Sequence, residues 1–302
     1  MPICNLCPRD CKVNRELGER GACGEGYKVR VARASLHMWE EPIISGERGS
    51  GTVFFSGCSL GCVYCQNHNI ADGTNGEEIT TDELASIFLH LQEKGAHNIN
   101  LVTGTHFVPV IRRALIAAKN RGLSIPIVYN TSSYETCDTI EMLRGLVDIY
   151  LPDFKYYSRD IALKYSNASD YFDVASLAID EMVKQQPKLI LDENDMLRSG
   201  VVVRHLLLPG CLEDSKMVLK YLYEKYGDSI FISIMNQYTP ISENLKNYPE
   251  LDRKVTLEEY DELVDFAVDL GITNAFVQEG EAAKESFIPD FENWNLHDFM
   301  LY

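Results

Sequence analysis

The stretch Gly57-Cys58-Ser59-Leu60-Gly61-Cys62-Val63-Tyr64-Cys65 places three cysteines within eight residues. A closed zinc site normally takes four protein ligands, whereas each iron of an iron–sulfur cube needs its own ligand outside the cube. Three cysteines would therefore leave one iron open to a ligand other than protein. The alternative at this point is a four-cysteine metal knuckle that borrows a distant cysteine.

The residues around these cysteines place them on a loop. Thr52-Val53-Phe54-Phe55 is β-branched and aromatic, which predicts a short strand. Gly57 and Gly61 allow the backbone to approach the sulfurs closely and to adopt positive φ. We therefore expect the cysteines on the loop that leaves the C-terminal end of a strand.

The spacing Cys-x3-Cys-x2-Cys, with the aromatic Tyr64 before the third cysteine, resembles the signature of the radical S-adenosylmethionine (SAM) superfamily. The resemblance implies a [4Fe-4S] cluster on Cys58, Cys62 and Cys65, whose open iron binds the amino and carboxylate groups of SAM. It further implies that one electron from the cluster cleaves SAM to methionine and a 5′-deoxyadenosyl radical. These cysteines would thus be both the metal ligands and the catalytic residues.

Composition restricts the possible partners. The chain has 302 residues and a formal net charge of −17, which disfavours nucleic acid and anionic membranes because both require clustered Lys and Arg. No stretch approaches 18 uninterrupted apolar residues, and the sequence starting at Met1 does not resemble a signal peptide. Nine cysteines without a secretory signal favour a cytoplasmic location and metal binding over disulfides.

Residues 1–45 are predicted to form a small cysteine-rich module. Four cysteines, Cys4, Cys7, Cys11 and Cys23, stand among dense glycines without a helical period. Modules of this size are commonly stabilised by metal. A second iron–sulfur cluster and a structural zinc both fit four thiolates, and the spacing does not choose between them.

Residues 46–302 are predicted to form a partial (β/α)6 barrel with a C-terminal tail, because strand and amphipathic helix patterns alternate along them. Two capping-box patterns, Thr80 with Glu83 and Thr256 with Glu259, mark helix starts. The strands are expected near 52–55, 98–102, 125–129, 147–151, 201–208 and 230–234, with a further one at 274–277. In such barrels the active site lies at the C-terminal ends of the strands, where the cysteine loop is expected.

Polar residues follow the other strands at the same rim. The runs are Thr103-Gly104-Thr105, Asn130-Thr131, Asp153-Phe154-Lys155, Arg204-His205 and Asn236-Gln237. Arg204 stands within an apolar strand pattern, so its charge must be paired. His205 and the nearby His106 are candidates either for substrate contact or for structural roles.

Several of these runs resemble strand ends of pyruvate formate-lyase activating enzymes, and the Cys4–Cys23 module resembles a branch of activase-like radical SAM proteins. The resemblance implies that Asn130, Thr131, Leu151 and Asp153 surround a monovalent cation beside the SAM carboxylate, and that Lys155 and Arg204 contact SAM. Tyr64, Thr103, Gly104, Thr105 and Gln237 are assigned to the same SAM-binding rim.

Two departures from the activase pattern stand in this rim. Activases usually have Asp at the place of Asn130, which puts the cation site in doubt. Their Gly-Gly-Glu motif, which binds the SAM amino group, is replaced by Thr103-Gly104-Thr105. Backbone carbonyls could still accept from the ammonium, although one charge-assisted hydrogen bond is lost.

The leading functional hypothesis is an activase-like enzyme that abstracts a hydrogen from a glycine α-carbon of a glycyl-radical protein. The alternative is a radical SAM enzyme that modifies a small molecule or a peptide. Either would need an electron donor such as flavodoxin or ferredoxin. An iron–sulfur electron carrier is the non-enzyme alternative, and it is disfavoured because a carrier needs neither an open iron nor a polar barrel rim.

Overall fold

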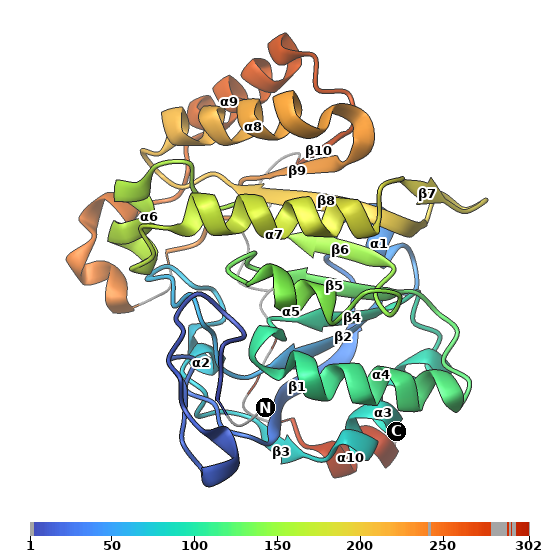
Figure 1. Ribbon diagram of the computed structural model, residues 1–302. Helices are drawn as coiled ribbons and strands as arrows, with labels where there is room; N and C mark the ends of the chain where they lie inside the picture. Colours follow the sequence, from blue (N-terminus) through green and yellow to red (C-terminus); the bar gives the residue numbers. More distant parts are fainter. Residues whose placement is uncertain (1–2, 241–242, 279–288, 290, 292–293, 302) are drawn as a thin grey trace.

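The computed structural model describes residues 3–240, 243–278, 289, 291 and 294–301. Its centre is one curved sheet whose strands are linked by helices that cover its outer face (Figure 1). The partial (β/α) barrel expected from the alternation of strands and helices is thereby confirmed.

Parallel strands form the centre of the sheet in the order β10-β9-β8-β6-β5-β4-β2. Each pairs in parallel with its neighbour. The further strand expected near 274–277 is present and pairs with β9. The bounds are β2 (Ser50–Phe55), β4 (Ile99–Val102), β5 (Ile127–Thr131), β6 (Ile149–Pro152), β8 (Leu197–Leu206), β9 (Phe231–Met235) and β10 (Ala275–Val277).

Antiparallel strands extend the sheet. β1 (Val29–His37) pairs with β2 on one side and with β3 (Glu77–Ile79) on the other, while β7 (Ile190–Leu191) pairs with β8. Because β1 runs opposite to β2, His37 lies across from Ser50 at the start of β2. The residues after β1 therefore arrive at the N-terminal ends of the parallel strands, the end opposite to the cysteine loop.

The helices follow the strands as expected, and both capping boxes are formed, at Thr80 with Glu83 and at Thr256 with Glu259. The α-helices are α1 (Pro42–Ser45), α2 (His68–Ala71), α3 (Thr81–Glu93), α4 (Val108–Asn120), α5 (Cys137–Glu141), α6 (Arg159–Ser166), α7 (Tyr171–Gln185), α8 (Leu212–Tyr226), α9 (Leu257–Leu270) and α10 (Leu296–Leu301). Short 3-10 helices span Arg15–Leu17, Thr105–Phe107, Gly227–Ser229, Glu243–Asn247 and Pro249–Leu251.

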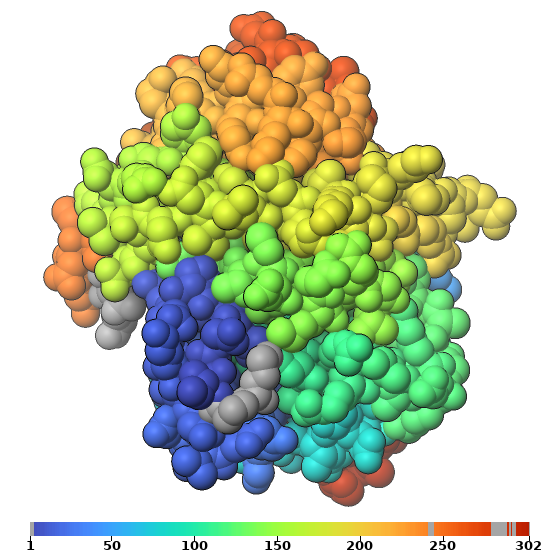
Figure 2. Space-filling view, viewed as in Figure 1, coloured from blue at the N-terminus to red at the C-terminus, as the bar shows by residue number. Residues whose placement is uncertain are grey.

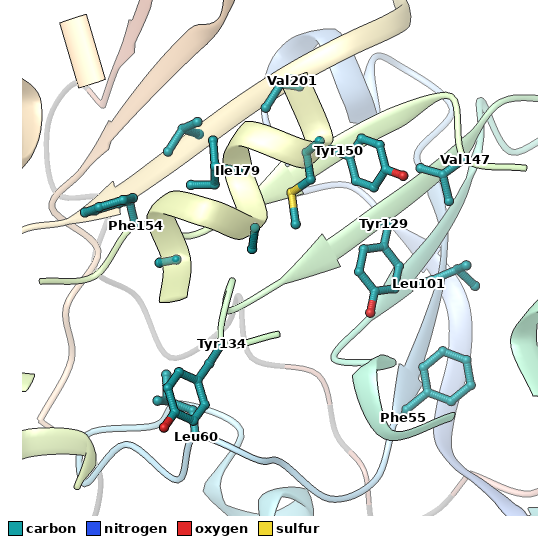
Figure 3. Close-up of a cluster of buried hydrophobic side chains, with 14 of the residues drawn as sticks. Phe55, Leu60, Leu101, Tyr129, Tyr134, Val147, Tyr150, Phe154, Ile179 and Val201 are labelled. Carbon is teal, nitrogen blue, oxygen red and sulfur yellow. The ribbon is translucent and has the colours of Figure 1, made fainter. Parts of the chain in front are cut away.

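The main hydrophobic core lies between the sheet and its helices, as the close-up in Figure 3 shows. Tyr129, Tyr150 and Val201 from the strands belong to the same cluster as Ile179 of α7, and all four side chains are fully buried. This burial holds the strands in register, and it thereby fixes the positions of the loops at their ends.

The described part of the C-terminal tail packs against the N-terminal half of the chain. Phe291 meets Phe54 edge to face with ring centroids 5.3 Å apart, and the Leu296 amide donates to Glu77 Oε2 over 2.8 Å. Parts of the tail lie outside the described residues. Among the described residues, the helices include none with the length and apolar character to cross a membrane.

We predict that Ile87→Ala in α3 lowers the free energy of unfolding by about 2–5 kcal/mol, because Ile87 is fully buried and its removal leaves a cavity. Ile116→Ala in α4 is the matched control, since 38% of Ile116 is exposed. Its effect should stay within about 0.5 kcal/mol. Chemical denaturation of the two variants measures both values, and equal losses would contradict the described packing of α3.

Candidate functional site

The cysteine loop leaves the C-terminal end of β2 and continues to α2. Gly57 has φ 82° and Gly61 has φ 67°, and residues that carry a side chain rarely adopt such positive φ angles. A Cβ on Gly57 would also lie 2.6 Å from the Cys23 carbonyl oxygen and 2.6 Å from Glu25 Cγ. Position 57 therefore requires a glycine for two reasons: its backbone φ is positive, and the N-terminal module approaches it too closely to leave room for a side chain.

Cys58, Cys62 and Cys65 all line one cavity of about 390 Å³. Burial, followed by the neighbouring thiols of Cys58 and Cys62, raises the pKa of Cys65 to about 12. The three sulfurs are thus close enough to interact electrostatically. A metal group that binds thiolates would supply the positive charge that this arrangement lacks.

A chain of buried hydroxyl groups ends on one of these sulfurs. The Ser166 hydroxyl donates to Cys62 Sγ over 3.1 Å, and it is also 2.7 Å from the Tyr156 hydroxyl. The Tyr64 hydroxyl lies 2.7 Å from that of Tyr156. Tyr64, the aromatic residue before the third cysteine, is therefore tied to Cys62 through two further hydroxyls.

The same cavity collects most of the residues expected at the SAM-binding rim. Those that line it are Tyr64, Thr103, Asn130, Thr131, Asp153, Lys155, Arg204 and Gln237. Gly104 and Thr105 are not among the lining residues. A Cβ on Gly104 would meet Ile111 Cδ1 of α4 at 2.6 Å, and Thr105 is buried.

Arg204 is the centre of a charge network inside the barrel. Its Nε donates to Asp153 Oδ1 over 2.9 Å, its Nη1 to Glu40 Oε2 over 3.1 Å, and its Nη2 to Asn130 Oδ1 over 2.6 Å. Lys155 Nζ donates to the other Asp153 oxygen, Oδ2, over 2.7 Å. The expectation that the Arg204 charge must be paired is confirmed. Burial by itself would raise the pKa of Asp153, but Arg204 and Lys155 stabilise its ionised form, and the pKa is lowered.

Glu40 and Glu41 were not predicted from the sequence. They follow β1 at the N-terminal end of the barrel and line the cavity opposite to the cysteine loop. Glu40 Oε1 accepts from Asn100 Nδ2 over 3.0 Å and from Asn130 Nδ2 over 3.3 Å. The sequence signal that could have found them is a pair of carboxylates between the apolar Trp39 and the helix-starting Pro42.

The four N-terminal cysteines lie near one another. The Sγ atoms of Cys11 and Cys23 are both within 3.5 Å of a Cβ placed on Gly21, and Arg15 Nη2 donates to Cys23 Sγ over 3.2 Å. Burial first, then Cys23, Cys4 and Cys11, raises the pKa of Cys7 to about 11. Within the described residues no three His, Cys, Asp or Glu side chains are already arranged to hold a single metal ion.

Arg9 joins the N-terminal module to the cysteine loop. Its Nε donates to the Ser59 carbonyl over 2.9 Å and its Nη2 to the Leu60 carbonyl over 3.1 Å, both between Cys58 and Cys62. Its other hydrogen bonds reach the carbonyls at the end of α6, Ser166 and Asn167. Figure 2 shows the N-terminal segment in blue lying directly against the middle of the chain in green.

The two histidine candidates have structural partners. A ring nitrogen of His205 lies 2.7 Å from the Phe154 carbonyl, and a ring nitrogen of His106 lies 2.7 Å from the Ser56 carbonyl. Burial lowers the pKa of His205 to about 4 and that of His106 to about 3, so both are neutral near pH 7. Neither is among the residues that line the cavity.

Comparison with known proteins agrees with this geometry. Residues 52–197, which carry the cysteine loop and the strands up to the start of β8, match the family described as the Radical SAM superfamily. The Uncharacterized protein MJ0674 of Methanocaldococcus jannaschii is 31% identical over 276 residues, which cover 87% of this chain and 74% of that protein. The chain belongs to the radical SAM superfamily.

Solved structures show the same fold at low sequence identity. SuiB of Streptococcus suis, in a crystal structure bound to S-adenosylmethionine, has a TM-score of 0.52 and 13% identity over 74% of this chain. The FeFe-hydrogenase maturase HydG from Carboxydothermus hydrogenoformans has a TM-score of 0.50 and 14% identity over 81% of this chain. The chain spans 49% of the SuiB chain and 54% of the HydG chain, about half of each.

Membership of this superfamily makes the protein a radical SAM enzyme, and it implies a [4Fe-4S] cluster and SAM as cofactors. The residues present fit both groups. Three thiols without a fourth nearby on the loop match a cluster with an open iron, and the cavity they face has a volume typical of small-molecule sites. Carboxylate, amide and cationic side chains along its wall suit the charged groups of SAM.

We predict that Arg204→Leu lowers the free energy of unfolding by about 3–5 kcal/mol, because it leaves the buried carboxylate of Glu40 without its cation and removes one of the two cations that pair with Asp153. Arg144→Leu serves as the control, since Arg144 pairs with Glu141 and Glu181 at the surface and its loss should change stability little. Denaturation curves measure both variants.

Calorimetric titration of the folded Arg204→Leu variant with SAM separates stability from binding. A large loss of stability with unchanged SAM affinity would leave Arg204 as a structural residue only. A variant as stable as the Arg144→Leu control would contradict the described charge network.

Proposed function

We propose that Cys58, Cys62 and Cys65 bind the [4Fe-4S] cluster and that the residues along the adjoining cavity bind SAM and the substrate. The observation that carries this proposal is that the three cysteines and eight of the ten expected rim residues line a single cavity. When bound, the cluster and SAM supply the one-electron cleavage that generates a hydrogen-abstracting radical. The chain itself orients SAM and excludes water around that step.

Within this site each charged residue receives a specific part. We assign Lys155 to the SAM carboxylate, and this is supported by its electrostatic effect on Cys58 and Cys65. Arg204 holds Asp153 and Asn130 in fixed positions. A monovalent cation beside Asn130, Thr131, Leu151 and Asp153 stays a prediction. Two of the oxygens that it would need already form hydrogen bonds, since Asn130 Oδ1 accepts from Arg204 and the Thr131 hydroxyl donates to Glu135.

The finer proposal is activase-like chemistry, in which the hydrogen is taken from a glycine α-carbon of a protein. The support for it is the set of strand-end runs, since Asn130, Asp153, Lys155 and Arg204 all line the cavity as the activase resemblance implies. A small molecule or a peptide is the second candidate substrate. The buried carboxylates of Glu40 and Glu41 favour this second candidate, because they line the cavity and could bind a polar group of a substrate.

We further propose that the N-terminal module, residues 1–45, holds a second iron–sulfur cluster or a zinc ion on Cys4, Cys7, Cys11 and Cys23. The support is that these cysteines lie together and that Arg9 connects their loop directly to the cysteine loop of the barrel. A redox-active metal in this place would lie on a route for electrons from a donor such as flavodoxin or ferredoxin.

We predict that replacing Cys58, Cys62 and Cys65 together by alanine abolishes formation of 5′-deoxyadenosine from SAM, because no thiolate remains to hold the cluster. Mass spectrometry after anaerobic reconstitution and reduction measures the product. The control is Cys137→Ala, since Cys137 is exposed and lies on α5, away from the cavity lining. If the triple variant forms 5′-deoxyadenosine at the normal rate, the proposed function is wrong.

The same triple variant should keep the metal of the N-terminal module, because its four cysteines are unchanged. Iron, zinc and sulfide analysis of the purified variant measures that metal. A metal-free variant with four titratable N-terminal thiols would contradict the proposed second site and leave the barrel site unaffected.

We predict that Ser166→Ala makes the reduction potential of the barrel cluster more negative, because it removes the hydrogen bond to Cys62 Sγ that offsets negative charge on the sulfur. A difference of about 1 kcal/mol corresponds to about 40 mV for one electron. Spectroscopically monitored redox titration measures it. Ser176→Ala in α7 is the control, because the Ser176 hydroxyl donates to the Phe172 carbonyl of its own helix and Ser176 is not among the described residues that line the cavity. Equal potentials in the two variants would contradict the prediction.

A further inference from the structure

The cavity has two ends with different chemistry. The cysteines lie at the C-terminal ends of the strands, while Glu40 and Glu41 enter from the corner between β1 and α1 at the N-terminal ends. Asp153, Lys155 and Arg204 stand between them. The proposed function assigns residues at the cysteine end and in the middle to the cluster and SAM, but it names no chemical group that the Glu41 end would bind.

The charges along the cavity do not balance. Apart from the cysteines, the described lining residues include three carboxylates, on Glu40, Glu41 and Asp153, against the two cations Lys155 and Arg204. Both cations are committed to Asp153 and Glu40. His37 also lines the cavity, and its pKa is lowered by burial and then by Arg204, so it adds no positive charge near pH 7.

Among the described residues Glu41 forms no direct ion pair in this network, although Arg204 acts on it electrostatically and Ser233 hydrogen-bonds to its carboxylate. Glu41 is 92% buried, since only 8% of its surface is exposed, and its Oε2 has no hydrogen-bond partner among the described residues. The Glu41 Oε2 atom is an acceptor in the wall of the cavity, so a hydrogen-bond donor that enters the cavity could bind to it. A buried carboxylate is costly unless a proton or a cation neutralises it.

The surroundings show what kind of group could reach Glu41. The cavity lining includes the apolar side chains of Trp39, Met235 and Phe276. A second hollow, lined also by the exposed Met38, shares Trp39, Glu40, Pro42, Gln237 and Gln278 with the cavity, and we take it as the path by which a ligand enters. A ligand entering along this path would pass apolar walls and end at a carboxylate.

We propose that Glu41 binds a cationic group of the substrate, an ammonium or a guanidinium carried on an apolar stem. This assignment rests on the proposed function, because it places the substrate in the cavity that SAM shares. The substrate class it names is an amine or guanidine compound, which includes a peptide with a basic side chain. An Oε2 acceptor without a partner would form a charge-assisted hydrogen bond to either group.

The test uses the full chain reconstituted with its cluster and two probes of nearly the same shape, n-butylguanidinium and the neutral n-butylurea. Ligand-observed NMR titration in the presence of SAM gives their affinities. We expect n-butylguanidinium to bind about tenfold more tightly or better. Equal affinity of the two probes would overturn the proposal.

Variants assign the preference to Glu41. Glu41→Gln should abolish the preference for the charged probe, and Glu41→Asp, which keeps the charge, should retain part of it. Glu47→Gln, which changes an exposed carboxylate just after α1, should leave it unchanged. Melting curves confirm that the variants are folded. A charge preference that survives Glu41→Gln, or that Glu47→Gln also removes, would overturn the proposal.

Two competition experiments distinguish other sources of the cation. If SAM displaces n-butylguanidinium, the cation at Glu41 is a group of SAM itself, and if potassium displaces it at equal concentration, the site is for an inorganic ion; either result overturns the substrate assignment. Formation of 5′-deoxyadenosine is measured on the same samples. If the samples form no 5′-deoxyadenosine but still prefer n-butylguanidinium over n-butylurea, the proposed function is contradicted and cation binding at Glu41 is retained.

Discussion

The structure of the site depends on the buried charge of Arg204. A guanidinium inside an apolar strand requires acceptors, and each of its nitrogens finds one on a different element: Asp153 after β6, Asn130 in β5 and Glu40 after β1. Because these bonds are directional, they fix the spacing of three strands and of the β1–α1 corner around the cavity. The same network orients Asp153 toward Lys155 near the cysteine loop.

The N-terminal module is held to the barrel by the same kind of contact. Arg9 donates to backbone carbonyls within the cysteine loop and at the end of α6, and Thr139 of α5 donates to the Leu6 carbonyl over 2.8 Å. Gly57 permits this close approach because any side chain there would collide with Cys23 or Glu25. A change in the module is therefore transmitted to the loop on which the cluster is proposed to sit.

The hydroxyl chain from Tyr64 through Tyr156 to Ser166 shows how the barrel adjusts its cysteine loop. All three residues are buried, and they come from the loop itself, from the segment after β6 and from α6. Such outer contacts decide the orientation and the electron density of a metal ligand. Ser166 is also the residue whose carbonyl Arg9 binds, so the module and the hydroxyl chain meet at the end of α6.

Periodicity and spacing were sufficient to predict the fold and the superfamily. Strand and helix patterns predicted the parallel strands and both capping boxes, and the spacing of Cys58, Cys62 and Cys65 indicated the superfamily. These features depend on residues close together in the chain. Of the rim residues, Gly104 and Thr105 were expected beside SAM but do not line the cavity, because strand-end position alone does not say which way a residue faces.

Only the tertiary structure decided which distant residues meet. The antiparallel course of β1 carries the chain to the N-terminal ends of the parallel strands, where Glu40 reaches Arg204, more than 160 residues further along the chain. Arg9 reaches the loop at Ser59 and the end of α6 in the same way. No local pattern encodes such pairs, because a buried charge requires a partner without specifying where in the sequence that partner stands.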